Sequence, residues 1–219
     1  MTRAVHAVLI AVPDAAWVRD QTLKEAVPVA SALGGLLERR FEEATIELVA
    51  PRSGGVTRAA VASAFAAARP AAGELFVVLF LGHGIPASED HPYQSWALTT
   101  EELTNIELAE QLHRLPPTVD TVVISDCCYG RGFYTAGTRA WDDAPAPMVC
   151  ISAAGRNVRR GSVLGAVASQ LVADVMAAAE QGASYRGLKE KFRRDRFSGR
   201  EFHVDARPAA RMSDLVLGM

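Results

Sequence analysis

The chain has 219 residues, of which 49% are hydrophobic, so it can bury a sizeable core and we expect a single domain over residues 1–219. Its 23 basic residues nearly balance its 25 acidic ones, and the formal net charge is −2. This balance argues against nucleic acid or an anionic membrane surface as the main partner.

The cysteines and the first apolar segment indicate the compartment. The chain has three cysteines, and two of them, Cys127 and Cys128, are adjacent, so we expect a reducing compartment rather than a disulfide framework. Residues 4–12 are apolar but run directly into Pro13 and Asp14, which indicates a first buried strand rather than a signal peptide. No stretch approaches the length of a transmembrane helix. We therefore expect a cytoplasmic protein.

The first half of the chain alternates strand and helix patterns. Apolar residues at helical spacing predict a helix over residues 28–41, beginning at Pro28, where a missing N–H costs nothing. Thr57 can cap an alanine-rich helix that ends before Pro70. Runs of β-branched and aliphatic residues predict strands over 4–12, 43–50 and 75–81.

A long connection follows the third strand. Residues 85–104 hold Trp96 and can include a short hairpin, and connections of this length are usually functional, so we expect this one to contact substrate. Thr104 and Glu107 form a capping-box pair that predicts a helix ending at Arg114.

The second half continues the alternation. Residues 131–147 contain glycine, proline and charged residues without periodicity, which is typical of an exposed loop. The other predicted elements are strands over 118–125 and 148–153, helices over 162–182 and 185–194, and a sixth strand within 202–217. Strands that alternate with helices predict an α/β fold with a mostly parallel sheet covered on both faces.

Two of the predicted strands end in reactive side chains. The run LFVVLFLGHG leads into His83, and the run DTVVISDCCYG leads into Cys128. Ligands of open α/β sheets bind at the carboxyl ends of parallel strands. A histidine roughly 50 residues before a cysteine of this kind is a local signature of caspase-type cysteine proteases.

The motifs GHG and SDCCYG resemble the histidine–glycine and D-x-C-x-x-G motifs of the metacaspase, orthocaspase and caspase superfamily. The order of elements is also similar over residues 3–217. The resemblance implies a caspase-like three-layer sandwich with a six-stranded sheet, and the activity of a cysteine endopeptidase. In the family pattern the nucleophile lies two residues after the aspartate, which selects Cys128 and leaves Cys127 in a variable place.

The chemistry of this activity assigns a role to each residue of the pair. Cysteine-mediated peptide hydrolysis needs a thiolate, a proton donor for the departing amine and dipoles that stabilise an oxyanion. An imidazolium at His83 would lower the pKa of Cys128 and later protonate the leaving nitrogen. The backbone N–H groups of Gly84 and Cys128 would bind the oxyanion, and Gly130 would permit a tight turn. The superfamily is described as using a dyad, so we assign no third residue.

Asp126 is the candidate for substrate specificity. Metacaspases carry aspartate at this place, where acid-specific caspases carry glutamine, and a buried carboxylate favours a cationic substrate side chain. The resemblance therefore implies cleavage after Arg or Lys, although Asp126 could also serve only as a turn residue. Metacaspases add acid to this pocket from the first helix, where Pro28 and Val29 stand here; Asp14, after the first strand, is the candidate replacement.

Other interpretations remain open at this point. The segment GRNVRRGS contains Arg159 and Arg160 and resembles the caspase loop that binds an acidic substrate residue, so acid specificity is an alternative. A catalytically silent scaffold or regulatory module is another. A different α/β hydrolase or a nucleotide-binding protein is disfavoured because no G-x-G-x-x-G motif follows a strand.

We expect no metal and no other cofactor. Metacaspases often bind calcium through surface acids. Asp90, Glu101 and Glu102 are available here but show no ligand spacing, and Thr135 stands where an acid would be expected. The expected partners are a protein or peptide substrate and, as a second candidate, a regulatory protein. Arg131 and Arg139 make self-cleavage in the loop after Cys128 a further hypothesis.

Overall fold

A computed structural model describes residues 3–16, 23–51, 55–89, 93–130, 147–153, 164–195, 202–207 and 209–218. In this part of the chain, six strands form one sheet in the order β2-β1-β3-β7-β8-β9. Its first five strands pair in parallel, and β9 pairs antiparallel to β8. These strands are β1 (Val5–Ala11), β2 (Ala44–Val49), β3 (Leu75–Leu81), β7 (Asp120–Asp126), β8 (Met148–Ser152) and β9 (His203–Arg207).

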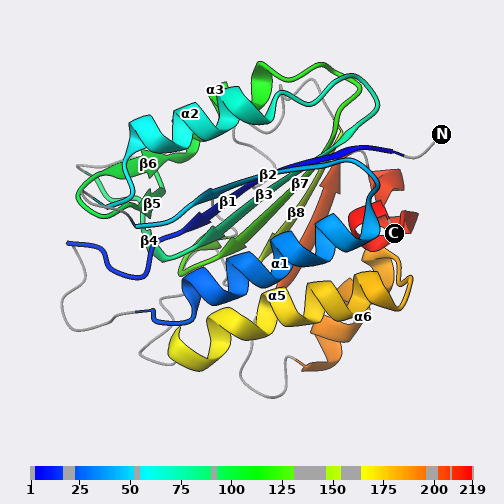
Figure 1. Cartoon of the computed structure of the whole chain (residues 1–219). Helices are drawn as coiled ribbons and strands as arrows, with labels where there is room; N and C mark the ends of the chain where they lie inside the picture. Colours follow the sequence, from blue (N-terminus) through cyan, green and yellow to red (C-terminus); the bar gives the residue numbers. More distant parts are fainter. Residues whose placement is uncertain are drawn as a thin grey trace.

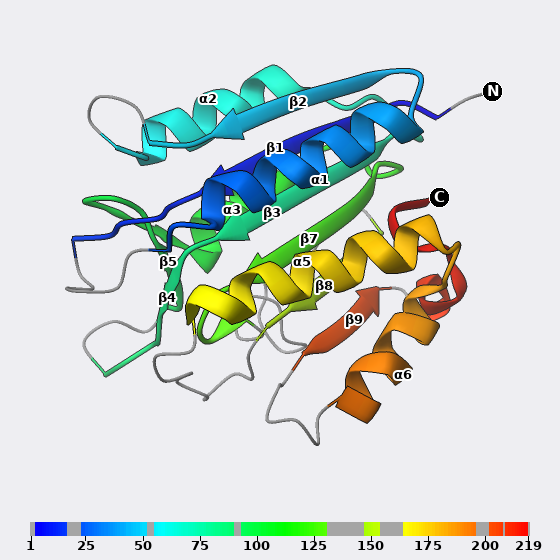
Figure 2. The same cartoon turned by 60° about the horizontal axis from the view of Figure 1, so that its bottom comes forward.

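Helices cover both faces of the sheet, as the sequence predicted. The helices are α1 (Ala26–Arg40), α2 (Arg58–Ala68), α3 (Asn105–His113), α5 (Leu164–Glu180) and α6 (Tyr185–Asp195). In Figure 1, α2 and α3 lie on one face, and α1, α5 and α6 lie on the other. Figure 2 shows α1 and α5 running side by side across the second face. The molecule is therefore a three-layer α/β sandwich.

The alternation of side chains along the central strands separates two cores. Leu9 of β1 lies opposite Leu79 of β3 in the parallel ladder, and both are fully buried in the core beneath α1 and α5. Val8 and Val78 are paired one position earlier and lie in the core beneath α2 and α3. All seven residues of β3 are buried, which explains why its sequence is an unbroken apolar run.

Helix α1 begins two residues earlier than predicted, at Ala26 instead of Pro28. Pro28 still lies in the first turn, where its missing N–H would have had no partner inside the helix. The backbone N–H of Val29 donates to the carbonyl of Glu25 at 2.9 Å, so the helical bonding starts before the proline. The prediction of the helix was correct and the prediction of its start was wrong.

The predicted caps of the next two helices are confirmed. The Thr57 hydroxyl accepts from the backbone N–H of Ala60 at 3.2 Å. Thr104 and Glu107 form both hydrogen bonds of the capping box at the start of α3. The predicted start of the later helix at Ser162 lies outside the described residues. None of the described helices is long and apolar enough to cross a membrane.

The long connection after β3 folds into a small antiparallel sheet, which confirms and extends the predicted hairpin. Its strands are β4 (His83–Ile85), β5 (Ser95–Ala97) and β6 (Glu102–Thr104). In Figure 1 this sheet lies at the end of the molecule toward which the parallel strands point. In the predicted tail, the sixth strand covers only β9, and the chain then forms the 3-10 helices η3 (Ala209–Ser213) and η4 (Val216–Gly218).

Candidate active site

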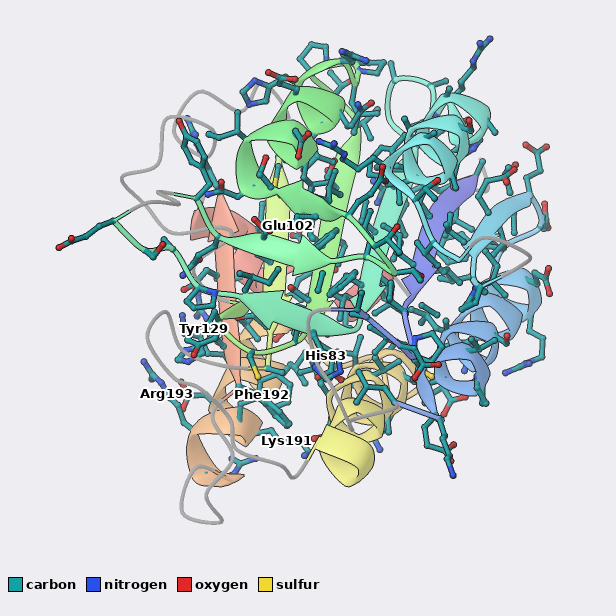
Figure 3. The ribbon with its side chains drawn as sticks, turned by 90° about the vertical axis from the view of Figure 1, so that its left-hand side faces the viewer. His83, Glu102, Tyr129, Lys191, Phe192 and Arg193 are labelled. Carbon is teal, nitrogen blue, oxygen red and sulfur yellow. The ribbon has the colours of Figure 1, made fainter. Side chains whose placement is uncertain are left out.

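The pairing of β3 with β7 brings the two predicted loops to the same edge of the sheet. Leu81, the last residue of β3, lies opposite Asp126, the last residue of β7. His83 and Cys128 each follow two residues after this pair. Figure 3 looks onto this edge, with His83 and Tyr129 labelled. Two residues that are far apart in the sequence thus follow the ends of neighbouring strands at equivalent positions.

The backbones of the two loops touch at Gly84. A Cβ atom placed on Gly84 would lie 1.8 Å from the carbonyl oxygen of Cys128 and 3.2 Å from the sulfur of Cys127. No side chain fits in that space, so only glycine allows the approach. His83 is 3% exposed and Cys128 is 7% exposed. The structure therefore packs Gly84 directly against Cys128. His83, the neighbour of Gly84, and Cys128 are both largely shielded from water, and electrostatic interactions are stronger in such a place than in solution.

The two adjacent cysteines lie on opposite faces of the sheet, as strand alternation predicts. Cys127 belongs to the core beneath α2 and α3, whereas Cys128 belongs to the cluster on the side of α1 and α5. Burial raises the pKa of the Cys127 thiol far above its usual range. The same cause raises the pKa of Cys150, which lies within β8. Both of these thiols are therefore protonated and unreactive at neutral pH.

The turn after Cys128 differs in detail from the expectation. Tyr129, not Gly130, adopts the left-handed conformation, with a φ of 58°. Gly130 is required for a different reason, because a Cβ atom there would lie 2.9 Å from the carbonyl oxygen of Ser125. A left-handed residue that carries a side chain costs about 1 to 2 kcal/mol. Such strain is often found at functional sites, and here it lies directly beside the candidate nucleophile.

The two candidate substrate-binding acids differ in their surroundings. Asp126 is 2% exposed, and its ladder partner Leu81 packs in the core beneath α1 and α5, on the same face as Cys128. Asp14 follows β1, the strand next to β3, and its side chain is exposed. Both acids lie at the edge that carries His83. Of the two acids, only Asp126 is held away from water.

Several predicted residues lie outside the described part of the chain. These are Asp90, Arg131 and Arg139, Arg159 and Arg160, and Thr135. Within the described ranges, no group of three or more His, Cys, Asp or Glu side chains is arranged to hold a metal ion.

The sequence did not indicate the role of Trp96. The structure places its indole N–H 3.0 Å from the Ser125 hydroxyl, beneath the loop that carries Cys128. This contact depends on how β5 pairs with β4. The sequence of β5, a three-residue segment within a long connection, gives no sign of that pairing.

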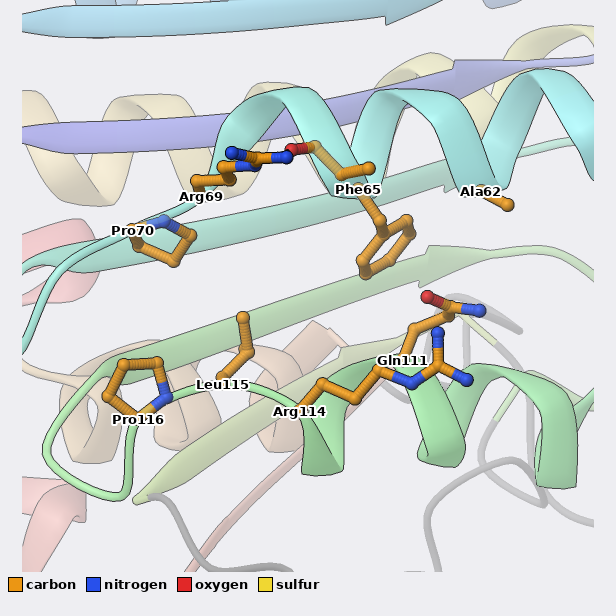
Figure 4. A pocket seen from close by; sticks show the side chains of 9 residues that line it. Ala62, Phe65, Arg69, Pro70, Gln111, Arg114, Leu115 and Pro116 are labelled. Atoms are coloured by element: carbon orange, nitrogen blue, oxygen red, sulfur yellow. The ribbon is translucent and has the colours of Figure 1, made fainter.

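A separate hollow of about 350 Å³ lies between the ends of α2 and α3 (Figure 4). Phe65 and Leu115 contribute apolar surface to it, and Arg69 and Arg114 stand at the two helix ends. Arg69 donates from Nε to the carbonyl of Ala66 at 2.7 Å, as expected for a cation at a helix carboxyl end. Because these helix ends lead into the starts of β3 and β7, the hollow is at the opposite edge of the sheet from His83.

Comparison with solved structures identifies the architecture. No protein-family model and no curated protein matches the chain. Protein GSU0716 from Geobacter sulfurreducens superposes with a TM-score of 0.64 at 20% identity, and the match covers 93% of both chains. Caspase-1 from Spodoptera frugiperda superposes with a TM-score of 0.60 at 10% identity, over 93% of this chain and 86% of that one.

The fold is caspase-like. This confirms the architecture that the two motifs implied, including the mostly parallel six-stranded sheet. At these identities the likeness shows the fold alone. A proposal about activity therefore depends on the residues at the sheet edge near His83 and Cys128.

The contact at Gly84 predicts a large effect of a single methyl group. We expect Gly84→Ala to lower the free energy of unfolding by about 3 kcal/mol, because the added carbon has to displace the Cys128 peptide. Gly187→Ala, on the exposed side of α6, meets only Ser184 Oγ at 3.7 Å and should be neutral or stabilising. Urea unfolding of both variants measures this difference. Equal stability of Gly84→Ala and the unmodified protein would contradict the close contact.

The separation of the thiols predicts selective alkylation of the folded protein. At about pH 8, iodoacetamide should modify Cys128 well before Cys127 or Cys150, because the raised pKa of Cys127 and Cys150 leaves almost none of those two thiols as thiolate. Peptide mapping by mass spectrometry assigns the modified residue, and the urea-unfolded protein serves as the control in which all three thiols react. Equal rates at Cys127 and Cys128 in the folded protein would contradict the assignment.

Proposed function

We propose that this protein is a cysteine endopeptidase in which His83 and Cys128 form the catalytic dyad. The observation that supports this most directly is the contact between the Gly84 backbone and the Cys128 carbonyl within a caspase-like fold. It brings the imidazole-bearing residue and the thiol-bearing residue to neighbouring strand ends. The residue types match the needs of acyl transfer.

The reaction proceeds in two stages. The Cys128 thiolate attacks the scissile carbonyl carbon, a C–S bond forms, and the carbonyl oxygen becomes an oxyanion that accepts from the N–H groups of Gly84 and Cys128. As the tetrahedral intermediate collapses, the C–N bond breaks and His83 gives its proton to the departing amine. A water molecule then gives a proton to His83 and attacks the thioester carbon. The C–S bond breaks, the carboxylic acid leaves, and the Cys128 thiolate and the protonated His83 are restored. Each oxyanion donor contributes about 3 kcal/mol to transition-state stabilisation.

Asp126 supports a preference for Arg or Lys before the scissile bond, as in metacaspases. The carboxylate is buried on the face that carries Cys128. A carboxylate held out of water binds a guanidinium bidentately, and the same burial disfavours an acidic side chain in the pocket. Asp14 is exposed, so in this proposal it adds weaker, salt-screened attraction at the pocket entrance.

A fluorogenic peptide with arginine before the reporter amide tests the dyad. We expect turnover by the unmodified protein, none by Cys128→Ala, and a loss of at least about 100-fold in kcat for His83→Ala, because a general acid–base contributes that much or more. An arginyl chloromethyl ketone should label the unmodified protein at Cys128 and leave Cys128→Ala unlabelled. Intact folding of the variants, checked by circular dichroism, is the control. No turnover and no labelling of the folded unmodified protein, with aspartyl as well as arginyl probes, would support the silent module instead.

Substitution of the buried acid tests specificity. Asp126→Asn keeps the shape of the side chain and removes its charge, so kcat/KM for arginyl substrates should fall by roughly 100-fold, as for the loss of a buried charge pair. Asp14→Asn, the exposed counterpart, should lower it by less than about tenfold at low salt. Matched peptides with arginine, lysine, aspartate or leucine at the same position provide the comparison. Faster cleavage after aspartate than after arginine in the unmodified protein would contradict the basic specificity.

A further inference from the structure

Four buried side chains lie beneath the two loops, on the side of the sheet that faces α2 and α3. The Trp96 N–H donates to the Ser125 hydroxyl at 3.0 Å, and that hydroxyl lies 3.3 Å from the Cys127 sulfur, within hydrogen-bonding reach. The indole also stacks on the ring of Phe80, with centroids 4.5 Å apart and planes 1° from parallel. Each of these four residues is at most 2% exposed.

These side chains contact the loop that carries His83. Trp96 lies opposite Gly84 in the ladder between β4 and β5, so its backbone holds the strand on which His83 stands. A Cβ atom on Gly82 would lie 2.5 Å from the Phe80 ring, which shows that this ring supports the turn into His83.

The same side chains contact the loop that carries Cys128. Ser125 is the residue before the last one of β7, and Cys127 directly precedes the candidate nucleophile. The Cys127 sulfur also lies beneath Gly84, 3.2 Å from the position that a Cβ atom would take. The chain of contacts from β5 to Ser125 and Cys127 therefore joins the two halves of the site from below.

We infer that Trp96 is a positioning residue for the proposed dyad. Its indole N–H, through Ser125 and Cys127, fixes the separation between the His83 and Cys128 loops. This inference rests on the proposed function and adds to it the hydrogen bond that holds the two catalytic groups in place. An indole that serves only as core packing also needs an acceptor for its N–H, so the two roles differ in what happens to Cys128 when the bond is removed.

Trp96→Phe and Ser125→Ala each remove this bond. The first keeps an aromatic face against Phe80, and the second removes the acceptor. The readout is the rate of Cys128 alkylation by iodoacetamide as a function of pH, assigned by peptide mapping. An imidazolium partner keeps Cys128 reactive well below the usual thiol pKa of about 8.5, so reactivity near pH 6 reports the dyad. This measurement requires no peptide substrate.

We expect each variant to lower the Cys128 alkylation rate near pH 6 by roughly tenfold or more, because a small misplacement of reacting groups has effects of this size. The rate at about pH 9.5 should change little, since the thiolate then forms without help. The double variant should be no slower than the single ones, because both remove the same interaction.

Phe65→Leu is the matched control. Phe65 is a buried aromatic residue of α2 on the same side of the sheet, and its ring packs against Phe76 at a centroid distance of 5.6 Å. The Phe65→Leu variant should lower the urea midpoint of unfolding, as Trp96→Phe does. It should leave the pH dependence of the Cys128 alkylation rate unchanged. A Trp96→Phe protein with lowered stability and an unchanged Cys128 profile would overturn the positioning role alone. An ordinary thiol profile in the unmodified protein would overturn both this role and the proposed dyad.

Discussion

The close approach of two peptide backbones, at Gly84 and Cys128, is the constraint on which the rest of this structure depends. A Cβ atom at position 84 would lie 1.8 Å from the Cys128 carbonyl oxygen, so the approach is closed to every residue but glycine. Register makes the approach possible, because Leu81 and Asp126 end their strands side by side. Tyr129, directly after Cys128, adopts a left-handed conformation. Together these features place an imidazole and a thiol on adjacent loops.

The sheet separates the proposed reactive residues from the side chains packed on its other face. Cys128 and Asp126 belong to the face of α1 and α5. Cys127 and Trp96 belong to the face of α2 and α3, where side chains are packed and hydrogen-bonded. The two adjacent cysteines are buried on opposite faces, because strand alternation turns Cys127 toward α2 and α3, where burial raises its pKa, and Cys128 toward α1 and α5, where we propose the site.

Much of this was predictable because the signals are local. The apolar runs before His83 and Cys128, the caps at Thr57 and Thr104, and the glycines that follow strands each depend on a few neighbouring residues. The start of α1 was missed because a proline is tolerated anywhere in the first turn, so its position does not define the first residue.

What could not be predicted depends on contacts between distant segments. The pairing of β5 with β4 decides that Trp96 reaches Ser125, and no periodicity encodes it. The reason for Gly130 was also hidden, since its packing against the Ser125 carbonyl appears only when the turn is formed.

Cleavage-site profiling of a diverse peptide library by mass spectrometry decides whether the two loops form one catalytic site. We expect cuts after Arg and Lys that vanish with Cys128→Ala. An identical peptide pattern from both proteins would show that the loops form no such site.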